Sequence, residues 1–457
     1  MFKTLRDAWK IKDLRRKLLW TLLLLIIFRF GANITAPGVD GLAVAEYSKT
    51  IAENGILYTL NIITGGGFSQ LAIFAMSIGP YITASIVIQL LTVAIPALEE
   101  LQKEGEAGKQ KLNDYTKYLA IVLGAIEAFG VYMMYRTAQV PMLQADGSYV
   151  YKNVFLGETM LTPFVFIMSL TAGSTLLMWI ADKISNLGVA NGSSLLIFAG
   201  IVVGLPNGIM SLVNSLVIPN GVFSPLGLLA FVAILVGAIV LIAAVVWVTE
   251  AERRVSVQYA KRVVGRKMYG GQSTNIPIKL AMAGVMPIIF AMSFMQFPSM
   301  IIGLINSNIA NETGFWAGVY KVFSFTSLTD KIGNWGYGVA HILIYLALIA
   351  IFTYFYTKMI FNTTEVANNL KKNGGFIPGI RAGKPTSDYL SNILKYVSGF
   401  GSIFLGVIAI IPILLAFTGL GVSFGGTAIL IVVSVALETM KQLEAQMMVR
   451  NYQGFID

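Results

Sequence analysis

The stretch that decides the fold reads Ala75-Met76-Ser77-Ile78-Gly79-Pro80-Tyr81-Ile82, and a second stretch reads Ala283-Gly284-Val285-Met286-Pro287-Ile288-Ile289-Phe290. In both, glycine and proline interrupt a hydrophobic run of membrane-spanning length. Each interrupted run is the second of five such runs in its half of the chain, counted from Leu18 and from about Pro225. Paired, interrupted membrane helices at corresponding positions are typical of a pathway between two repeats. We therefore expect the functional site where these two segments face each other.

The composition is that of a membrane protein. Of the 457 residues, 56% are hydrophobic and only 12% are charged, and the mean hydropathy is +0.72. A soluble protein of this size has about a quarter of its residues charged. Because a helical span needs about 20 mostly apolar residues, we predict an all-α polytopic membrane protein with ten transmembrane helices. They lie at about 18–37, 76–95, 118–136, 155–180, 193–213, 225–249, 281–305, 338–357, 396–418 and 425–440.

The basic residues are distributed unevenly between the two sides of the predicted spans. Most of the 33 Lys and Arg residues fall in segments on the side of the N-terminus. Since loops rich in Lys and Arg remain cytoplasmic, both termini are expected in the cytosol. The net charge of +10 then belongs to a cytosolic face. That face can reflect topology and attraction to anionic lipid, or it can dock a partner.

Two long basic loops on this face favour docking. In the loop 250–280, Val255, Val257 and Tyr259 alternate with polar residues, as in a strand. With a turn candidate at Gly265, the pattern predicts a protruding basic hairpin. In the loop 358–395, glycine and proline mark turns at both ends and place Arg381 near a tip. Long structured loops are usually functional, so we predict docking of an acidic or RNA-rich partner, because phosphate neutralisation dominates RNA binding.

The segment 60–74 is mildly apolar, is too short to span a membrane and contains three consecutive glycines. Three glycines destabilise a helix, because ordering them costs more entropy than ordering other residues. The segment can cap the bundle, or it can fold back into a cavity, where irregular backbone at membrane depth is buried in protein or faces water. We favour the second interpretation, because the segment runs directly into the break at Gly79 and Pro80.

The predicted bundle interior is poor in ionisable groups. Arg29 and Glu127 are the clear cases within spans, and such scarcity argues against a proton- or sodium-driven carrier. For Arg29, snorkelling or a helix-terminus contact is favoured over a gating role. His341 is the single histidine, cysteine is absent, and neither a phosphate-binding loop nor a nucleophile motif occurs. We therefore predict no catalytic residue, no metal site and no cofactor.

Isoleucines beside the two breaks leave two interpretations open. Ile82 and Ile289 each lie two residues after the proline of a break, and Ile86 lies one helical turn beyond Ile82 on the same face. Packing against lipid or the protein core explains most isoleucines in membranes. The alternative is the lining of a pore closed by apolar side chains.

Five segments strongly resemble the bacterial SecY protein-translocation channels, and the similarity extends from the first span to the tail. These segments are Ile82 to Val93, Lys103 to Glu106, Tyr259 to Arg262, Gln272 to Lys279 and Phe376 to Gly383. The resemblance implies an hourglass channel of two inverted five-helix halves, 18–215 and 216–440, hinged near the link between spans 5 and 6. An amphipathic segment, 1–17, would precede them, and a cytosolic tail, 441–457, would follow. The channel would open laterally to lipid between spans 2 and 7.

The resemblance also implies the residues of a channel site. An apolar ring at the waist would comprise Ile82, Ile86, Ile197, Ile289 and Ile431. A further ring position falls on Ser193, which would make the ring less apolar there. A plug, a short helix over about 60–74, would seal the external funnel and includes Gly65, Gly66, Gly67, Phe68 and Ser69. Many members of the family have asparagine at the lateral gate, where this chain has Ala281.

The partners that the resemblance implies are those of protein export. Docking of the SecA motor ATPase and of the ribosome would use Arg253, Arg254, Lys261, Arg262 and Arg381. SecE and SecG subunits, membrane lipids and substrates with signal sequences complete the expected partners, and the bacterial plasma membrane is the expected location. Two alternatives from the residues alone are a secondary transporter, which would need ionisable groups beside the breaks, and a membrane-embedded enzyme.

Overall fold

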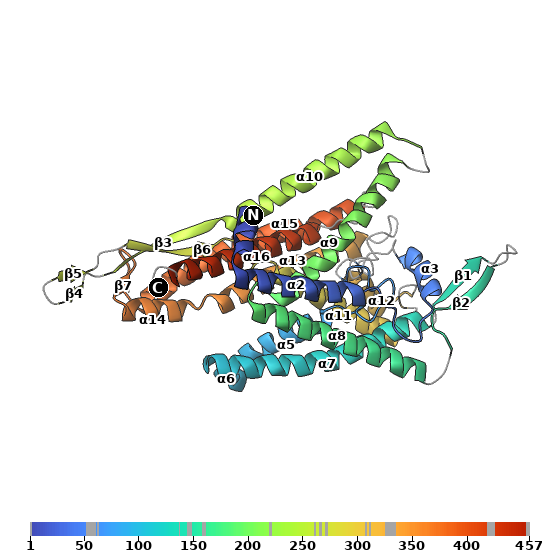
Figure 1. The fold of residues 1–457 in the computed structure, drawn as a ribbon, viewed down its shortest axis with the longest axis horizontal. Helices are drawn as coiled ribbons and strands as arrows, with labels where there is room; N and C mark the ends of the chain where they lie inside the picture. Colours follow the sequence, from blue (N-terminus) through green and yellow to red (C-terminus); the bar gives the residue numbers. More distant parts are fainter. Residues whose placement is uncertain are drawn as a thin grey trace.

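The protein is a long bundle of helices with small antiparallel sheets at its two ends (Figure 1). The computed structural model describes residues 2–51, 61, 64–136, 138–143, 149–157, 161–218, 222–259, 262–264, 267–269, 273–306, 309, 312–324, 335–417 and 426–453. The turn predicted at Gly265 lies outside these described residues.

The helices cover most of the described chain. They are α1 (Phe2–Lys10), α2 (Lys12–Gly31), α3 (Gly41–Ile51), α5 (Gly79–Ala94), α6 (Pro96–Lys103), α7 (Glu106–Arg136), α8 (Leu161–Leu187), α9 (Gly192–Leu212), α10 (Pro225–Glu250), α11 (Met286–Ile305), α12 (Phe315–Phe323), α13 (Trp335–Ile360), α14 (Thr363–Lys372), α15 (Lys384–Phe417) and α16 (Gly426–Gln453). A π-helical turn, η1 (Val213–Val217), extends α9.

The strands are short and pair locally, except in one sheet. They are β1 (Gln139–Leu143), β2 (Tyr149–Asn153), β3 (Glu252–Tyr259), β4 (Arg262–Val264), β5 (Lys267–Tyr269), β6 (Ser273–Lys279) and β7 (Gly375–Phe376). β1 pairs with β2 and β4 with β5, whereas β6, β3 and β7 form a three-stranded antiparallel sheet in that order.

Each of the ten predicted spans contains a helix of the structure: α2, α5, α7, α8, α9, α10, α11, α13, α15 and α16. Among the described residues, seven helical stretches are long and apolar enough to cross a membrane. α5 has only 16 residues and meets α6 at a bend of 101°. A polytopic, helical membrane protein is confirmed, and ten spans are consistent with these helices.

The two breaks coincide with the starts of helices. α5 and α11 each have a proline in the first turn, Pro80 and Pro287. A proline is favoured there, because its fixed φ suits a helix and the missing N–H would have no partner within the helix. The preceding residues form turns, with positive φ at Ser77 and Gly284. The predicted spans 76–95 and 281–305 therefore start a few residues before these helices, which begin at the breaks.

One of two further boundaries agrees with the prediction and the other differs. α9 continues through Pro206 and ends at Leu212, close to the predicted end at residue 213, because one proline removes a single helical hydrogen bond and apolar residues follow it. α16 continues to Gln453, so most of the predicted tail is helical. Its Lys, Glu, Gln and Met residues after Met440 are good helix formers.

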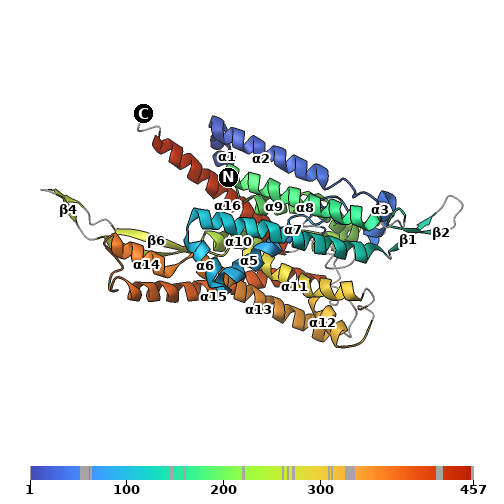
Figure 2. The same ribbon diagram turned by 90° about the horizontal axis from the view of Figure 1, so that it is seen from below.

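The ends of the bundle separate the segments that the charge pattern assigns to opposite sides. The β3–β6 hairpin, α6 and α14 lie at one end, and α3 with the β1–β2 hairpin lies at the other (Figure 1). Turned by 90°, the bundle has α1 and α2 along one side and α12 and α13 along the opposite side (Figure 2). The arrangement fits the predicted sidedness, and which end faces the cytosol stays a prediction.

The largest apolar cluster lies in the middle of the bundle and joins α2, α5, α8, α9, α10, α11, α13, α15 and α16. α10 contributes little to it. This helix contacts α16 and η1, but Leu229, Ile239 and Trp247 are 65–76% exposed. In Figure 1, α10 lies along the outer edge of the bundle, as expected of a helix with a lipid-facing surface.

An ion pair ties the β1–β2 hairpin to the start of α3, outside the predicted spans. The Asp40 carboxylate accepts hydrogen bonds from the backbone N–H groups of Leu42 and Ala43 at 3.0 and 3.4 Å. Its other oxygen lies 2.5 Å from Lys152 Nζ in β2. The hydrogen bond from Lys152 is the largest cause of a lowered pKa of Asp40, aided by the two amides and opposed by burial.

We predict that Asp40→Asn makes the stability of the protein less sensitive to acid. Because the folded-state pKa of Asp40 lies below its ordinary value of 3.8, the carboxylate stabilises the fold fully above that value. This contribution is lost as the pH falls below it. The thermal midpoint in detergent, measured at about pH 7 and about pH 3, should fall more for the wild type than for Asp40→Asn. The control Asp388→Asn, in the exposed first turns of α15, should behave as the wild type, and equal acid sensitivity of all three would contradict the prediction.

Candidate channel site

Five isoleucines from four helices meet in the central cluster. Ile86 of α5, Ile197 of α9, Ile289 of α11 and Ile431 of α16 are buried, with exposed fractions of 3–9%, and the half-buried Ile82 of α5 packs against the same cluster. They are separated by up to several hundred residues in sequence, yet they share one apolar cluster. The structure thus brings the predicted ring residues together, and their role as a pore ring stays a prediction.

Such a cluster has a defined chemistry. Aliphatic side chains offer no hydrogen bonds, so they discriminate little between the segments of a passing polypeptide, and an apolar constriction gates by excluding water. Ser193, the predicted polar position of the ring, lies half-buried in the first turn of α9. Its hydroxyl donates to Asn191 Oδ1 at 2.8 Å, so its hydrogen-bonding capacity is partly used at the start of its own helix.

The two helices that begin at the breaks are in contact. α5 packs against α11, which also contacts α7. Ala281 lies half-buried in the turn that precedes α11. The sequence prediction that these two segments face each other is confirmed, whereas their separation as a lateral gate is not tested by this arrangement.

The predicted plug is packed among the helices. Thr64, Phe68, Leu71 and Phe74 are 0–5% exposed, which agrees with a segment that folds back into the protein rather than capping it. Residues 64–71 form turns, so the implied short helix does not continue through them. The physical reason is the positive φ of Gly65 and Gly66, +66° and +90°, which a right-handed helix cannot contain.

Glycines on three surrounding helices allow the plug segment to approach closely. A Cβ atom at Gly31 of α2 would lie 2.1 Å from the Phe74 ring, and one at Gly173 of α8 would lie 2.1 Å from the Ile73 carbonyl oxygen. A Cβ atom at Gly65 would lie 3.1 Å from Gly200 Cα of α9. The sequence analysis missed these contacts; small residues on membrane helices are the signal that could have pointed to them.

Arg29 has a partner that the sequence analysis did not foresee. Its Nη1 donates a hydrogen bond to the Gly65 carbonyl oxygen at 2.6 Å. Snorkelling and a helix-terminus contact were the favoured interpretations. The structure instead directs this guanidinium to the backbone of the plug segment, as charged side chains at membrane depth often pair with carbonyls.

The two basic loops form one structural unit. β3 pairs with β6 along its length: Glu252 is opposite Lys279 at one end, and Gln258 is opposite Ser273 at the other. This pairing confirms the predicted hairpin. β3 also pairs with β7, where Gln258 is opposite Phe376. α14, Ile377 after β7, and the start of α15 pack on this sheet through a separate apolar cluster. β7 has two residues, too few for a strand pattern in the sequence, so the joining of the loops was not predicted.

The arginines predicted to dock partners are exposed where the structure describes them. Arg253 and Arg254 lie on β3, and Arg254 Nε lies 2.7 Å from Glu252 Oε1. Arg381 is exposed in the turn before α15, and its carbonyl accepts from Thr386 Oγ1 at 2.9 Å. Two more of the predicted residues, Lys261 and the side chain of Arg262, lie outside the described part of the chain.

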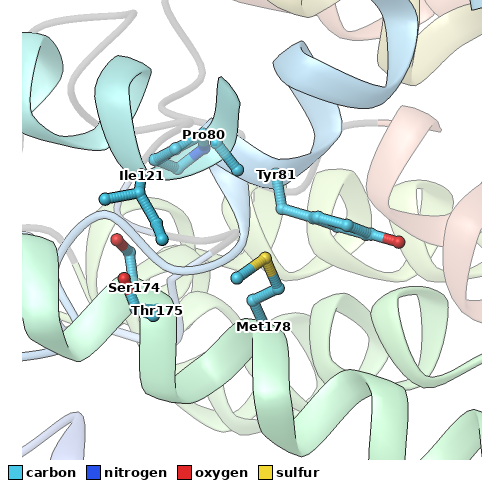
Figure 3. Close-up of a pocket in the computed structure, with 7 residues that line it drawn as sticks. Pro80, Tyr81, Ile121, Ser174, Thr175 and Met178 are labelled. Atoms are coloured by element: carbon cyan, nitrogen blue, oxygen red, sulfur yellow. The ribbon is translucent and has the colours of Figure 1, made fainter. Parts of the chain in front are cut away.

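A small pocket lies between α5, α7 and α8 and encloses about 170 Å³ of space that includes open solvent (Figure 3). It is lined by Pro80, Tyr81, Ala120, Ile121, Ser174, Thr175 and Met178. The hydroxyls of Ser174 and Thr175 both donate to the Thr171 carbonyl, and the Tyr81 hydroxyl donates to Asn113 Oδ1 at 3.5 Å. No group of three His, Cys, Asp or Glu in the described ranges could hold a metal ion.

Comparison with known proteins agrees with this arrangement. "Protein translocase subunit SecY" of Streptomyces lividans is 39% identical over 461 residues, and that of Mycobacterium bovis is 42% identical over 464 residues, each covering 100% of both chains. Two solved structures share the fold, each with 20% identity over 94% of this chain and 91% of the other. One is "a protein conducting channel", with a TM-score of 0.62. The other is a SecY channel described by the role of its plug domain in the closed state, with a TM-score of 0.64.

Sequence, fold and site converge on a single group of proteins. The sequence model of the SecY family matches residues 72–440. This range contains all five isoleucines predicted to form the ring and both halves of the basic sheet. Together with the full-length relatives, the match shows that this chain belongs to the SecY family.

Proposed function

We propose that this protein is the channel-forming subunit of a protein translocase in the bacterial plasma membrane, with both termini in the cytosol. It conducts unfolded secretory proteins across the membrane and releases transmembrane segments into lipid between α5 and α11. The observation that carries the proposal is the meeting of five isoleucines from α5, α9, α11 and α16 in one cluster, in a chain of the SecY family.

The physics of transport requires such a constriction. An extended polypeptide cannot cross hydrocarbon, because each unsatisfied backbone group costs several kcal/mol. Water-filled funnels on both sides would remove this cost everywhere except at the narrow waist. Isoleucine side chains at the waist accept any passing sequence, and when closed they exclude water and ions. The halves 18–215 and 216–440 would hinge near η1 and the link that follows it.

Lateral release follows from the contact between α5 and α11. A signal sequence is an apolar run, so it gains burial by partitioning between two helices into lipid. These two helices touch each other, and each begins at a proline after a turn with positive φ. Neither start has a side-chain cap, and an uncapped helix start is held less firmly than a capped one.

The energy for transport comes from partners. We propose that the SecA motor ATPase and the ribosome dock on the sheet of β6, β3 and β7, where Arg253, Arg254 and Arg381 are exposed. SecE and SecG are the proposed accessory subunits. Two solved structures with this fold support a ribosomal partner: a canine ribosome–channel complex with a TM-score of 0.61, and a yeast Ssh1 complex bound to the 80S ribosome, with a TM-score of 0.58.

Depletion of the protein from its host cell tests the function. Secretory precursors with uncleaved signal sequences should accumulate, and expression of the wild-type chain should clear them. Impaired transport of a small solute, without any accumulation of precursors, would favour the secondary transporter instead. Co-purification separates the two classes as well, because ribosomes or a cytosolic ATPase should accompany a translocation channel and not a solute carrier.

The same depleted cells test the docking surface. We predict that Arg381→Glu lowers the rate of precursor export by about three- to tenfold, because a reversed charge repels an acidic or phosphate-rich partner. The protein should fold normally, since the Arg381 side chain is exposed. Arg136→Glu, an equal charge reversal at the exposed opposite end of α7, is the control and should export normally. Normal export by Arg381→Glu would remove this residue from the docking surface.

A further inference from the structure

Several polar groups in the first part of the plug segment form hydrogen bonds with other groups of the same segment. The Asn61 carbonyl accepts from Gly66 N at 2.8 Å and from Thr64 Oγ1 at 3.1 Å, and Asn61 Oδ1 accepts from Ser69 N at 2.9 Å. Thr64 Oγ1 accepts from Phe68 N, and Ser69 Oγ donates to the Gly66 carbonyl. Moving Asn61 and residues 64–69 together would therefore break none of these bonds, so these described residues can act as one compact unit.

The following residues anchor this unit to the chain after α2. The Leu71 carbonyl accepts from Ala36 N, and Ile73 N donates to the Ile34 carbonyl, both at 2.8 Å. Leu71 has a φ of +43°, which is uncommon for a residue with a branched side chain. Residues 71–73 are thus fixed by these hydrogen bonds to the chain after α2, and the compact unit could turn about them.

One polar contact joins the unit to the surrounding helices in the described part of the chain. It is the hydrogen bond from Arg29 Nη1 of α2 to the Gly65 carbonyl, at 2.6 Å. The left-handed backbone of Gly65 and Gly66 presents this carbonyl to α2. On its other side Gly65 lies against Gly200 of α9, where a Cβ atom would be only 3.1 Å from the Gly200 Cα. The unit is therefore held between an arginine and a glycine.

The charge of Arg29 makes this contact stronger than an ordinary hydrogen bond. A hydrogen bond with an ionised donor is roughly twice as strong as a neutral one. None of the ion pairs between described residues includes Arg29, so the carbonyl is its protein partner in this arrangement. If the unit moved away, a charge at membrane depth would lose that partner, which is unfavourable.

We infer that Arg29 is the latch of the plug: a positioning residue that holds Asn61 and residues 64–69 in the closed channel through the Gly65 carbonyl. The inference deepens the proposed function and rests on it. The latch acts on backbone, so it needs a charged donor of the right reach at position 29 and a glycine at position 65. A translocating chain opens the channel by displacing the unit and breaking this contact.

Labelling of a single cysteine tests the latch directly. The protein has no cysteine, so Ser69→Cys, at a half-buried position of the unit, introduces a unique thiol. Arg29→Gln in this background should raise the rate of labelling by an external, membrane-impermeant maleimide by about tenfold, as expected for the loss of one charge-assisted hydrogen bond. Arg136→Gln, which removes one exposed charge from the end of α7, is the matched control and should leave the rate unchanged.

Further variants keep the test decisive. Arg29→Lys keeps the charge and should give an intermediate rate. Gly65→Ala, which strains a positive φ and crowds Gly200, should also raise the rate, even if Arg29→Gln does not fold. The double variant Arg29→Gln with Gly65→Ala should exceed neither single variant by much, because both act on one contact. Unchanged labelling of folded Arg29→Gln and Gly65→Ala would overturn the latch.

Export assays separate the latch from the proposed function. Vesicles that contain the wild-type chain and its partners should import a secretory precursor, and Arg29→Gln should import it at least as well while leaking ions at rest. If the wild type imports the precursor but the variants label as the wild type does, the latch alone is wrong. If the wild type imports no precursor and its depletion causes no export defect, the proposed function is wrong.

Discussion

Vesicles containing the protein with Ile82, Ile86 and Ile289 all replaced by serine should conduct ions at rest at least about tenfold faster than vesicles with the wild type. These side chains come from the two helices that begin at the breaks, and all three belong to the central apolar cluster. Three hydroxyls would offer hydrogen bonds to water at the waist. A constriction that excludes water through its apolar surface would then become wet, and ions would follow.

The control for this experiment is a second triple serine variant with the same chemical change on the outer surface. Leu229, Ile239 and Val240 of α10 are 62–69% exposed, so their replacement should leave the conductance unchanged. Size-exclusion chromatography must show folded protein for both variants, since serine in a buried apolar position destabilises the fold. A folded central variant with wild-type conductance would rule out the isoleucine ring as the seal.

The substitution Gly192→Ala should destabilise the protein by about 3 kcal/mol, the upper part of the range for overpacking. Gly192 begins α9, and a Cβ atom there would lie 1.9 Å from the Ala181 carbonyl oxygen and 2.6 Å from its carbon. Both are backbone atoms of α8, so no side-chain rotation can relieve the clash. The two helices would have to separate, and the thermal midpoint in detergent should fall.

Gly204→Ala is the matched control on the same helix. A Cβ atom at Gly204 would have nothing within 4 Å, and alanine is favoured over glycine inside a helix by roughly 0.5–1 kcal/mol. This variant should therefore unfold at the wild-type temperature or slightly above it. A Gly192→Ala protein as stable as Gly204→Ala would show that α8 and α9 do not pack as closely as described.

The sequence predicts features that repeat along the chain. The spans follow from hydropathy, and the strand β3 follows from the alternation of Val255 and Val257 with polar residues. The facing of α5 and α11 follows from their matching glycine and proline residues. In each case the signal extends over many residues or occurs twice, so a local pattern is enough to reveal it.

Features that depend on a single approach between distant segments could not be predicted in this way. Gly173 faces the Ile73 carbonyl and Gly200 faces Gly65, but a glycine in a membrane helix has many other possible roles. Arg29 stood out as a charge within a span, yet its partner is a backbone carbonyl, which every residue possesses. The turns before α5 and α11 are a third case, because hydropathy continues across each break and does not report backbone direction.

The sharing of one sheet by both basic loops has a mechanical consequence. β3 continues directly from α10, β6 is separated from α11 only by residues 280–285, and β7 lies between α14 and α15. The Leu280 N–H also donates to the Ala251 carbonyl, which closes the base of the hairpin. A force applied to this sheet is therefore transmitted to three long helices, α10, α11 and α15. The force reaches α11 through the short connection 280–285.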